Sequence, residues 1–480
     1  MNLIYRNLKI LILLGITAIV NPYLYGQVSG KSFRAGSAKS IITPPIGTSI
    51  NGGMQDRQVR YIHDETYARG MVLDDGDNQL AIVVSDLCMI YRETVDKAKE
   101  RAHEFTGIPM KNIVMSANHT HSAGTACSVF QSDPDPEYLE FLRIKIADAV
   151  IRAYENRVPA KIGWGFGKES SLVFNRRWRM KPGTEIMNPF GTQDKVKMNP
   201  GVGNPNNLEP AGPIDPEIPV VSVVSLEGDP IAIFSNYSLH YVGGTGPGEI
   251  SGDYYGIFSK KIEELIGVKK DGPSFVGFMS NGTSGDINNI DFSGEYLQAK
   301  GQYVQMNYVA NKVASEVYKV YQNIEYKDWV PLHSTQEEME LGVRMPDKND
   351  IERAESIVEK AAGPNMKTLE EIYARETLQL KEFPESVNLL LQAHRIGDLV
   401  IATIPCEVFV EIGLELKEKG PFEDMFTISL ANGYNGYLPT PEHHALGGYE
   451  TWRAKSSYLE VNASRKITDT LMEMMRKLKE

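Results

Sequence analysis

The chain has 480 residues, of which 23% are charged and 42% are hydrophobic. These proportions exclude a polytopic membrane protein, a collagen-like chain and a wholly disordered chain. The 62 acidic residues outnumber the 50 basic residues and give a net charge of -12. Because no block of like charges is long enough to bind a phosphate backbone, we expect a globular protein that does not bind nucleic acid.

The N-terminal segment predicts export. Arg6 and Lys9 precede the apolar run Ile10–Val20, which is too short to span a bilayer comfortably. We therefore expect residues 1–26 to be a cleavable signal peptide, with an uncleaved anchor as the alternative. The mature chain, 27–480, is then exported, periplasmic or secreted, and has no transmembrane segment.

Strand and helix signals alternate along the mature chain. Gly70–Asp74 and Gln79–Ser85 predict a hairpin, Arg92–Thr106 predicts a helix, and Lys111–Ser116 predicts a strand. Further expected elements are a helix over Glu137–Tyr154, hairpins over Pro219–Leu226 with Pro230–Ser235 and over Asn388–His394 with Leu399–Ile404, a surface loop over Pro182–Pro216, and a helical hairpin over Asp347–Phe383. No linker divides this region, so we predict one large α/β domain over 27–480, with mixed β-sheets flanked by helices.

Three cysteines, Cys88, Cys127 and Cys406, are spread along the chain without C-x-x-C spacing. This spacing excludes a cysteine metal cluster. A domain of this size buries enough apolar surface to stand without disulfides. We expect the three cysteines to be small buried residues.

A histidine pair follows the predicted strand Lys111–Ser116. His119 and His121 are two positions apart, so on an extended segment both imidazoles face the same way. Neutral imidazole nitrogens bind divalent metals such as zinc. A metal site and a pair of hydrogen-bonded turn histidines both fit this motif.

Three more polar positions follow apolar strands. His240 enters a glycine-rich turn, where either a ligand site or a capping histidine fits. Glu407 follows Ile404-Pro405-Cys406, and we expect it at the start of a helix, where the helix dipole favours a carboxylate with or without a function. Tyr437 lies in a turn-rich stretch where tyrosines commonly pack as amphipathic residues.

In this order, the motifs resemble the neutral/alkaline non-lysosomal ceramidases. The resemblance joins His119-Thr-His-Ser122, the strand-end His240, Pro405-Cys-Glu407 and Asn432-Gly-Tyr434-Asn-Gly-Tyr437, and it extends from about Phe33 to Tyr449. The family consists of zinc amidases that cleave N-acylsphingosine. The resemblance therefore implies an exported zinc-dependent hydrolase that acts on a small-molecule or lipid amide through zinc-activated water.

The resemblance also implies residue roles. Zinc is expected to be held by His119, His240, Glu407 and Tyr437, a donor set that suits zinc chemistry. On the substrate side we expect His121 as a proton shuttle and Arg176 or Tyr449 as oxyanion stabilisers.

Two departures from the family pattern bear on the substrate. Asn288 stands where the family has an active-site serine, and an amide can hydrogen-bond but cannot act as a nucleophile. The further C-terminal β-rich domain of full-size ceramidases is expected to be absent. Two alternatives therefore stay open: a metal-dependent hydrolase or lyase acting on a carbohydrate or another non-ceramide substrate, and a non-catalytic binding relative.

Overall fold

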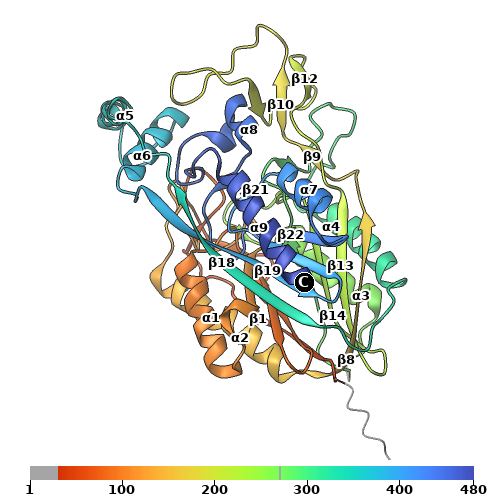
Figure 1. Ribbon diagram of the computed structural model, residues 1–480. Coiled ribbons are helices and arrows are strands. Elements are labelled where there is room, and N and C mark those ends of the chain that lie inside the picture. Colours follow the sequence, from red (N-terminus) through yellow and green to blue (C-terminus); the bar gives the residue numbers. More distant parts are fainter. Residues whose placement is uncertain (1–30, 270–271) are drawn as a thin grey trace, which may run out of the picture. The chain divides into compact units, whose positions relative to one another are not determined.

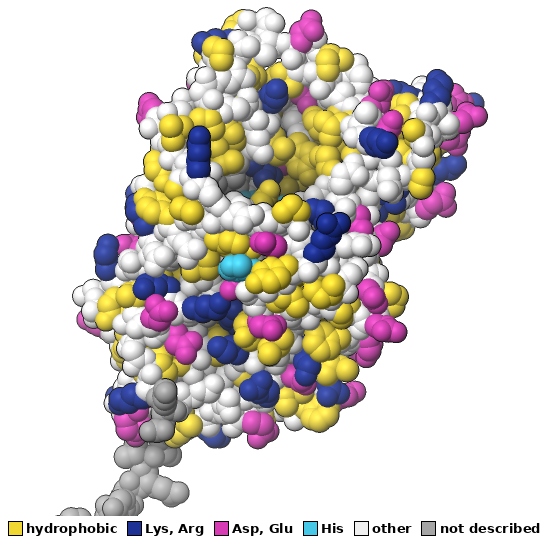
Figure 2. Space-filling view, turned by 180° about the vertical axis from the view of Figure 1, so that it is seen from behind, with side chains coloured by type: hydrophobic (Ala, Val, Ile, Leu, Met, Phe, Trp, Pro, Cys, Tyr) yellow, Lys and Arg dark blue, Asp and Glu magenta, His cyan; other side chains and the backbone are white. Residues whose placement is uncertain are grey.

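The computed structural model describes residues 31–269 and 272–480, so the expected signal peptide, 1–26, lies outside the described residues. One unit spans Ser32–Glu480. No helix within the described residues is long and apolar enough to cross a membrane. On the face shown in Figure 2, acidic and basic side chains are interspersed.

The largest sheet has eight strands, and most neighbours in it are antiparallel. The exceptions are the parallel pairs β14·β16 and β6·β7. In spatial order the strands are β16 (Val276–Asn281), β14 (Pro230–Tyr237), β13 (Glu217–Ser225), β8 (Val158–Lys168), β1 (Arg34–Ile41), β5 (Tyr67–Asp74), β6 (Gln79–Ser85) and β7 (Ile113–Ala117).

A second, four-stranded sheet packs on the first (Figure 1). Its strands in spatial order are β18 (Leu332–Gly342), β19 (Ser386–Ile396), β20 (Leu399–Thr403) and β22 (Asp424–Ile428). Shorter pairings complete the strands: β2 (Ser49–Ile50) with β3 (Arg57–Gln58), β4 (Tyr61–Ile62) with β15 (Glu249–Ile250), β9 (Phe174–Asn175) with β17 (Ile287–Asn288), β10 (Arg177–Met180) with β11 (Val196–Met198) and β12 (Asn207–Pro210), and β21 (Glu407–Val408) with β23 (Tyr437–Leu438).

Helices cover the two outer faces of this sandwich. Helices α1 to α4 pack on the large sheet, whereas α7 and α9 pack on the small one. The helices are α1 (Arg92–Thr106), α2 (Pro136–Glu155), α3 (Asp253–Ile266), α4 (Val304–Tyr321), α5 (Lys348–Lys360), α6 (Leu369–Leu380), α7 (Val410–Lys419), α8 (Pro441–Leu446) and α9 (Ala463–Lys479), with 3-10 turns at Met110–Asn112 and Tyr449–Thr451.

The large sheet is covered on both faces because its strands carry hydrophobic side chains on both sides. In β6, Ala81 and Val83 face helices α1 and α2, while Ile82 and Val84 face the second sheet. Successive strand residues point to opposite faces, and here both faces are covered, so the strand is hydrophobic on both sides. The expected α/β class with mixed sheets flanked by helices is confirmed.

One sequence prediction of local structure needs correction. The segment expected as a loop over Pro182–Pro216 contains the short strands β11 and β12, both paired with β10. They were missed because strands of three and four residues are too short to show a periodic pattern in the sequence. The helical hairpin expected in Asp347–Phe383 is confirmed as α5 and α6, and both helices begin with a capping box.

We predict that Phe234→Ala destabilises the fold by about 3–5 kcal/mol. Phe234 is fully buried between the sheets, with ring centroids 4.9 Å from Phe278 and 5.9 Å from Phe426 of the facing sheet. Chemical denaturation measures the change in the free energy of unfolding. Leu226→Ala is the control, because that side chain is 52% exposed and its truncation should change stability by less than about 0.5 kcal/mol. A loss below about 1 kcal/mol for Phe234→Ala contradicts the proposed packing.

Candidate metal centre

The expected site residues follow strands of both sheets. His119 and His121 follow β7, and His240 follows β14, both in the large sheet. Glu407 follows β20 and Tyr437 follows β22, both in the small sheet. Backbone hydrogen bonds join the sheets at this end, from Ala117 N to Leu430 O at 3.2 Å and from Ser429 N to Asn281 O at 3.0 Å. The loops of the two sheets therefore meet in one place.

Glu407 does not begin a helix, as the sequence suggested. It lies in β21, where its register partner across the parallel pair is Tyr437 of β23, and α7 begins only at Val410. The backbone N–H of Glu407 donates to Gly436 O at 2.9 Å. The pairing is long-range, so local helix signals could not reveal it. It places the carboxylate and the phenol side by side.

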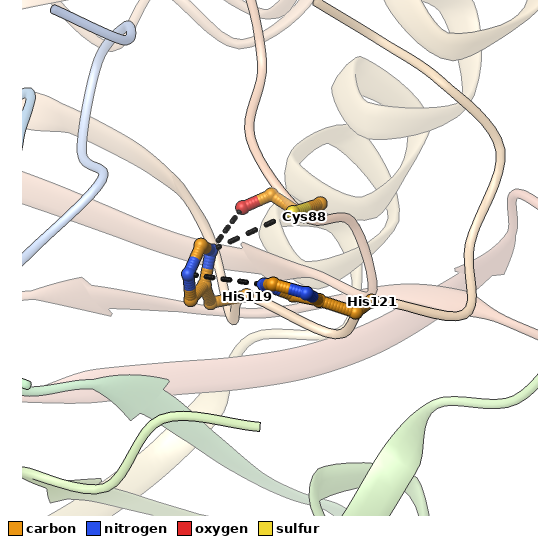
Figure 3. A group of neighbouring side chains, drawn as sticks. All are labelled: Cys88, His119 and His121. Carbon is orange, nitrogen blue, oxygen red and sulfur yellow. Dashed lines mark hydrogen bonds between the residues drawn. The ribbon is translucent and has the colours of Figure 1, made fainter. Parts of the chain in front are cut away.

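The side chains of His119 and His121 lie close together as expected, but the backbone between them is not extended. His119 has a left-handed φ of 76°, so the segment turns instead of continuing as a strand. Its Nε2 atom nevertheless lies 3.3 Å from Nε2 of His121 (Figure 3). A non-glycine residue in this conformation costs on the order of 1–3 kcal/mol and persists where the surroundings fix it, commonly at functional sites.

Second contacts fix the orientation of two imidazoles. His119 Nδ1 lies 2.8 Å from the carbonyl oxygen of Cys88, and His240 Nδ1 lies 3.0 Å from that of Ser284. Because a carbonyl can only accept, both Nδ1 atoms carry the proton. In the neutral form of both rings, the two Nε2 atoms then present lone pairs toward one another, 2.9 Å apart. Imidazoles that bind metals are oriented in this way by their other ring nitrogen.

A carboxylate completes the group. Glu407 Oε1 accepts a hydrogen bond from the Tyr434 hydroxyl at 2.9 Å. The other oxygen, Oε2, is buried without a hydrogen-bond partner in the described residues, 3.2 Å from His119 Nε2 and 3.8 Å from His240 Nε2. Donor atoms of His119, His240 and Glu407 all lie within 4.8 Å of one another. Two lone pairs and an unpartnered anionic oxygen fit a divalent cation.

The pKa shifts place one positive charge in this group, on the imidazole of His119, and a metal bound there would displace that proton from Nε2. Burial, and then the charge on His119, holds the pKa of His240 and of His121 well below the ordinary value. Burial also lowers the pKa of His119, but Cys88 and Glu407 raise it to about 10. Neutral His240 and His121 are in the form that ligates metals.

The other predicted residues lie close to this group. Arg176 Nη2 donates to the Tyr437 hydroxyl at 3.1 Å, and the Tyr449 and Tyr437 rings are 5.7 Å apart. His121 stacks on Tyr241, with ring centroids 3.6 Å apart. His119, His121, Glu407, Tyr437 and Tyr449 all line one cavity of about 30 Å³. This is room for one or two water molecules beside the donors.

Asn288 contacts a loop instead. Its Nδ2 donates to Asn199 Oδ1 at 2.9 Å, and its Oδ1 accepts from Ile290 N at 2.8 Å. It is not among the residues that line the cavity at the histidines.

Three supporting residues were given no role in the site from the sequence. Cys88, expected as a buried packing residue, is buried and free, but it also holds His119 through its carbonyl and has Sγ 3.7 Å from Nδ1 (Figure 3). Tyr434 orients Glu407. Glu450 pairs with Arg176 Nε at 2.9 Å and with Arg177 at 2.7 Å, and all three are buried. Glu450 directly follows Tyr449 in the sequence, and this adjacency is the one signal that could have identified it.

A second donor group lies outside this cavity. Asp286, Glu411 and His443 have donor atoms within 4.8 Å of one another. Here the imidazole already has a partner, because His443 Nε2 lies 2.7 Å from Glu411 Oε1. Burial, and then the neighbouring Glu411, raises the pKa of Asp286 to about 7. Protonation of Asp286 therefore relieves the repulsion between the two carboxyl groups without a cation.

We predict that His119→Ala and His240→Ala each lower zinc affinity at least about 100-fold, since each removes one donor from the group. Elemental analysis after dialysis against buffered zinc measures the bound metal. His443→Ala is the matched control and should retain about one zinc per chain. Retention of zinc by both His119→Ala and His240→Ala, or its loss in His443→Ala alone, places the metal elsewhere.

No known family model matches the chain. Two solved structures have similar folds. One is the neutral ceramidase from Pseudomonas aeruginosa, with a TM-score of 0.71, 18% identity and coverage of 93% of this chain and 74% of that chain. The other is a ceramidase complexed with C2, with a TM-score of 0.71, 16% identity and coverage of 93% and 75%. The fold of this chain is that of the neutral ceramidases.

Proposed function

We propose that the protein is an exported zinc-dependent amidohydrolase that cleaves the N-acyl amide of ceramide-like substrates. The observation that carries this proposal is the convergence of His119, His240 and Glu407, whose two imidazole Nε2 atoms lie close to a buried, unpartnered carboxylate oxygen. The ceramidase fold supports the reaction class. We further propose 1–26 as the signal peptide and 27–480 as the catalytic domain.

His119, His240 and Glu407 would hold the zinc, with Tyr437 as the fourth donor. Zinc bound there supplies a Lewis acid and lowers the pKa of a water to about 7. The chain contributes rigidity: the carbonyls of Cys88 and Ser284 fix the imidazoles, and Tyr434 fixes the carboxylate. Arg176 holds the hydroxyl of Tyr437, and Glu450 holds Arg176.

His121 is placed to move a proton. It lines the cavity with its Nε2 facing the other imidazoles, and its lowered pKa keeps it neutral at pH 7. A neutral imidazole can take a proton from the attacking water and deliver it to the leaving amine.

Tyr449 is placed to stabilise negative charge. Burial, and then the charge on Glu407, raises its pKa above the ordinary value, so the phenol stays protonated and can donate a hydrogen bond. An oxyanion forming at the acyl carbon needs such a donor. Asn288 cannot supply a nucleophile, so the proposed reaction uses water, with Asn288 limited to hydrogen bonding.

We expect short-chain N-acylsphingosines to be cleaved by the zinc-loaded protein, and we expect His121→Ala to lower kcat about 10²–10⁴-fold because it removes the proton carrier. Sphingosine release measures turnover. His333→Ala, an exposed histidine on β18, is the control and should leave kcat unchanged. Bound zinc in His121→Ala shows that the metal centre survives the change.

We also expect Tyr449→Phe to lower kcat about 10–100-fold while KM changes little, because the lost donor acts on developing charge. An equal loss in Tyr241→Phe would contradict a specific role for Tyr449. If no amide is cleaved and the protein binds no zinc, the non-catalytic alternative replaces this proposal.

A further inference from the structure

A second, larger cavity lies beside the metal centre. Its volume is about 480 Å³, and it is lined mainly by polar and charged side chains from Gln55 to Gln58, Arg60, Gln131 and Asn365. It is large enough for part of a small-molecule substrate.

Neighbouring residues line the two cavities. Gly52 and Gly53 line the smaller cavity at the histidines, and Gln55 to Gln58 of the same β2·β3 hairpin line the larger one. In the same way, Phe130 lines the smaller cavity and the next residue, Gln131, lines the larger one. Arg57 connects them directly, because its Nη2 donates to the carbonyl of His121 at 2.8 Å. A ligand in the larger cavity is therefore a neighbour of the proposed reaction site.

The walls of the larger cavity are held in place by amide hydrogen bonds. Gln131 donates to Met54 O at 2.9 Å and Met366 O at 3.0 Å, and accepts from Met366 N at 2.8 Å. Gln55 donates to Met366 O at 2.7 Å. Met366 lies in the linker between α5 and α6, so the helical hairpin closes one side. A preformed polar wall lowers the cost of ordering a ligand.

The charges in this wall favour an anion. Among the described residues, neither Arg57 nor Arg60 forms an ion pair. Nη2 of Arg57 donates to the carbonyls of Asn51 and His121, whereas the exposed Arg60 side chain has no hydrogen-bond partner in the part of the chain that the structure describes. The one acid in the lining, Asp56, already accepts a hydrogen bond from the Ser49 hydroxyl at 2.6 Å. A guanidinium with a free donor binds carboxylate, sulfonate or phosphate oxygens well, and the glutamine and asparagine amides can bind neighbouring polar groups.

We propose that this cavity is a substrate subsite that binds an anionic, hydrogen-bonding group carried next to the scissile amide. This rests on the proposed amidohydrolase function and specifies its substrate class. A substrate that spans both cavities is an amide with a charged headgroup, whereas a neutral ceramide would leave both arginines without an anionic partner.

Turnover of paired amides tests the proposal. The pairs are N-octanoyltaurine with N-octanoylpropylamine, and N-octylsuccinamic acid with N-octylbutanamide, which carry the anion on opposite sides of the bond. We expect kcat/KM for the anionic member of at least one pair to exceed that of its neutral partner about 10-fold or more. Arg60→Gln should remove this advantage through KM and leave the neutral amides unchanged. Arg465→Gln, which changes an exposed arginine on α9, is the matched control.

Sulfate binding tests the subsite independently of turnover. Calorimetry with sodium sulfate, at ionic strength held constant with sodium chloride, should show binding that Arg60→Gln weakens about 10-fold and Arg465→Gln does not. Equal rates within both pairs together with sulfate binding unaffected by Arg60→Gln overturn the subsite. If no amide is cleaved, the amidohydrolase proposal fails, and the sulfate measurement still decides whether the cavity binds anions.

Discussion

A buried carboxylate oxygen without a hydrogen-bond partner is costly, and Glu407 Oε2 is such an atom. Among the described residues its charge is balanced by the imidazole of His119, at 3.2 Å, which comes from the other sheet and whose pKa is raised to about 10. The interaction therefore depends on the packing of the two sheets through their shared hydrophobic layer. Any change that shifts one sheet against the other separates the charges and leaves the carboxylate unpaired.

Buried ion pairs hold the side chains around this contact in fixed orientations. Arg176 and Arg177 converge on Glu450, a carboxylate that is fully buried. Burial raises the pKa of Glu450, but Arg177 and Arg176 more than offset that effect and lower it. Two cations around one anion leave a net positive charge next to Tyr437. A positive charge in this position would stabilise negative charge that develops on a substrate in the site.

The sequence predicted the fold where the signals are local. Hairpins such as Gly70–Ser85 were visible because strand periodicity and an Asp-Gly turn lie within a few residues of each other. The site was less accessible: the grouping of His119, His240 and Glu407 came from the resemblance, since no spacing rule links positions so far apart. The placement of Glu407 at a helix start was wrong because a long-range pairing with Tyr437 prevails over the local preference. The metal and the substrate stay predictions.

The β21·β23 pair is only two residues long on each side, and it sets Glu407 against Tyr437. Because neighbouring strand residues point to opposite faces, a slip by one position would turn Val408 toward the imidazoles and the carboxylate away from them. An insertion or deletion between these two segments should therefore preserve the site only if it leaves the pairing of Glu407 with Tyr437 unchanged. Loop grafting in this protein should leave both dipeptides, and the turns that enter them, untouched.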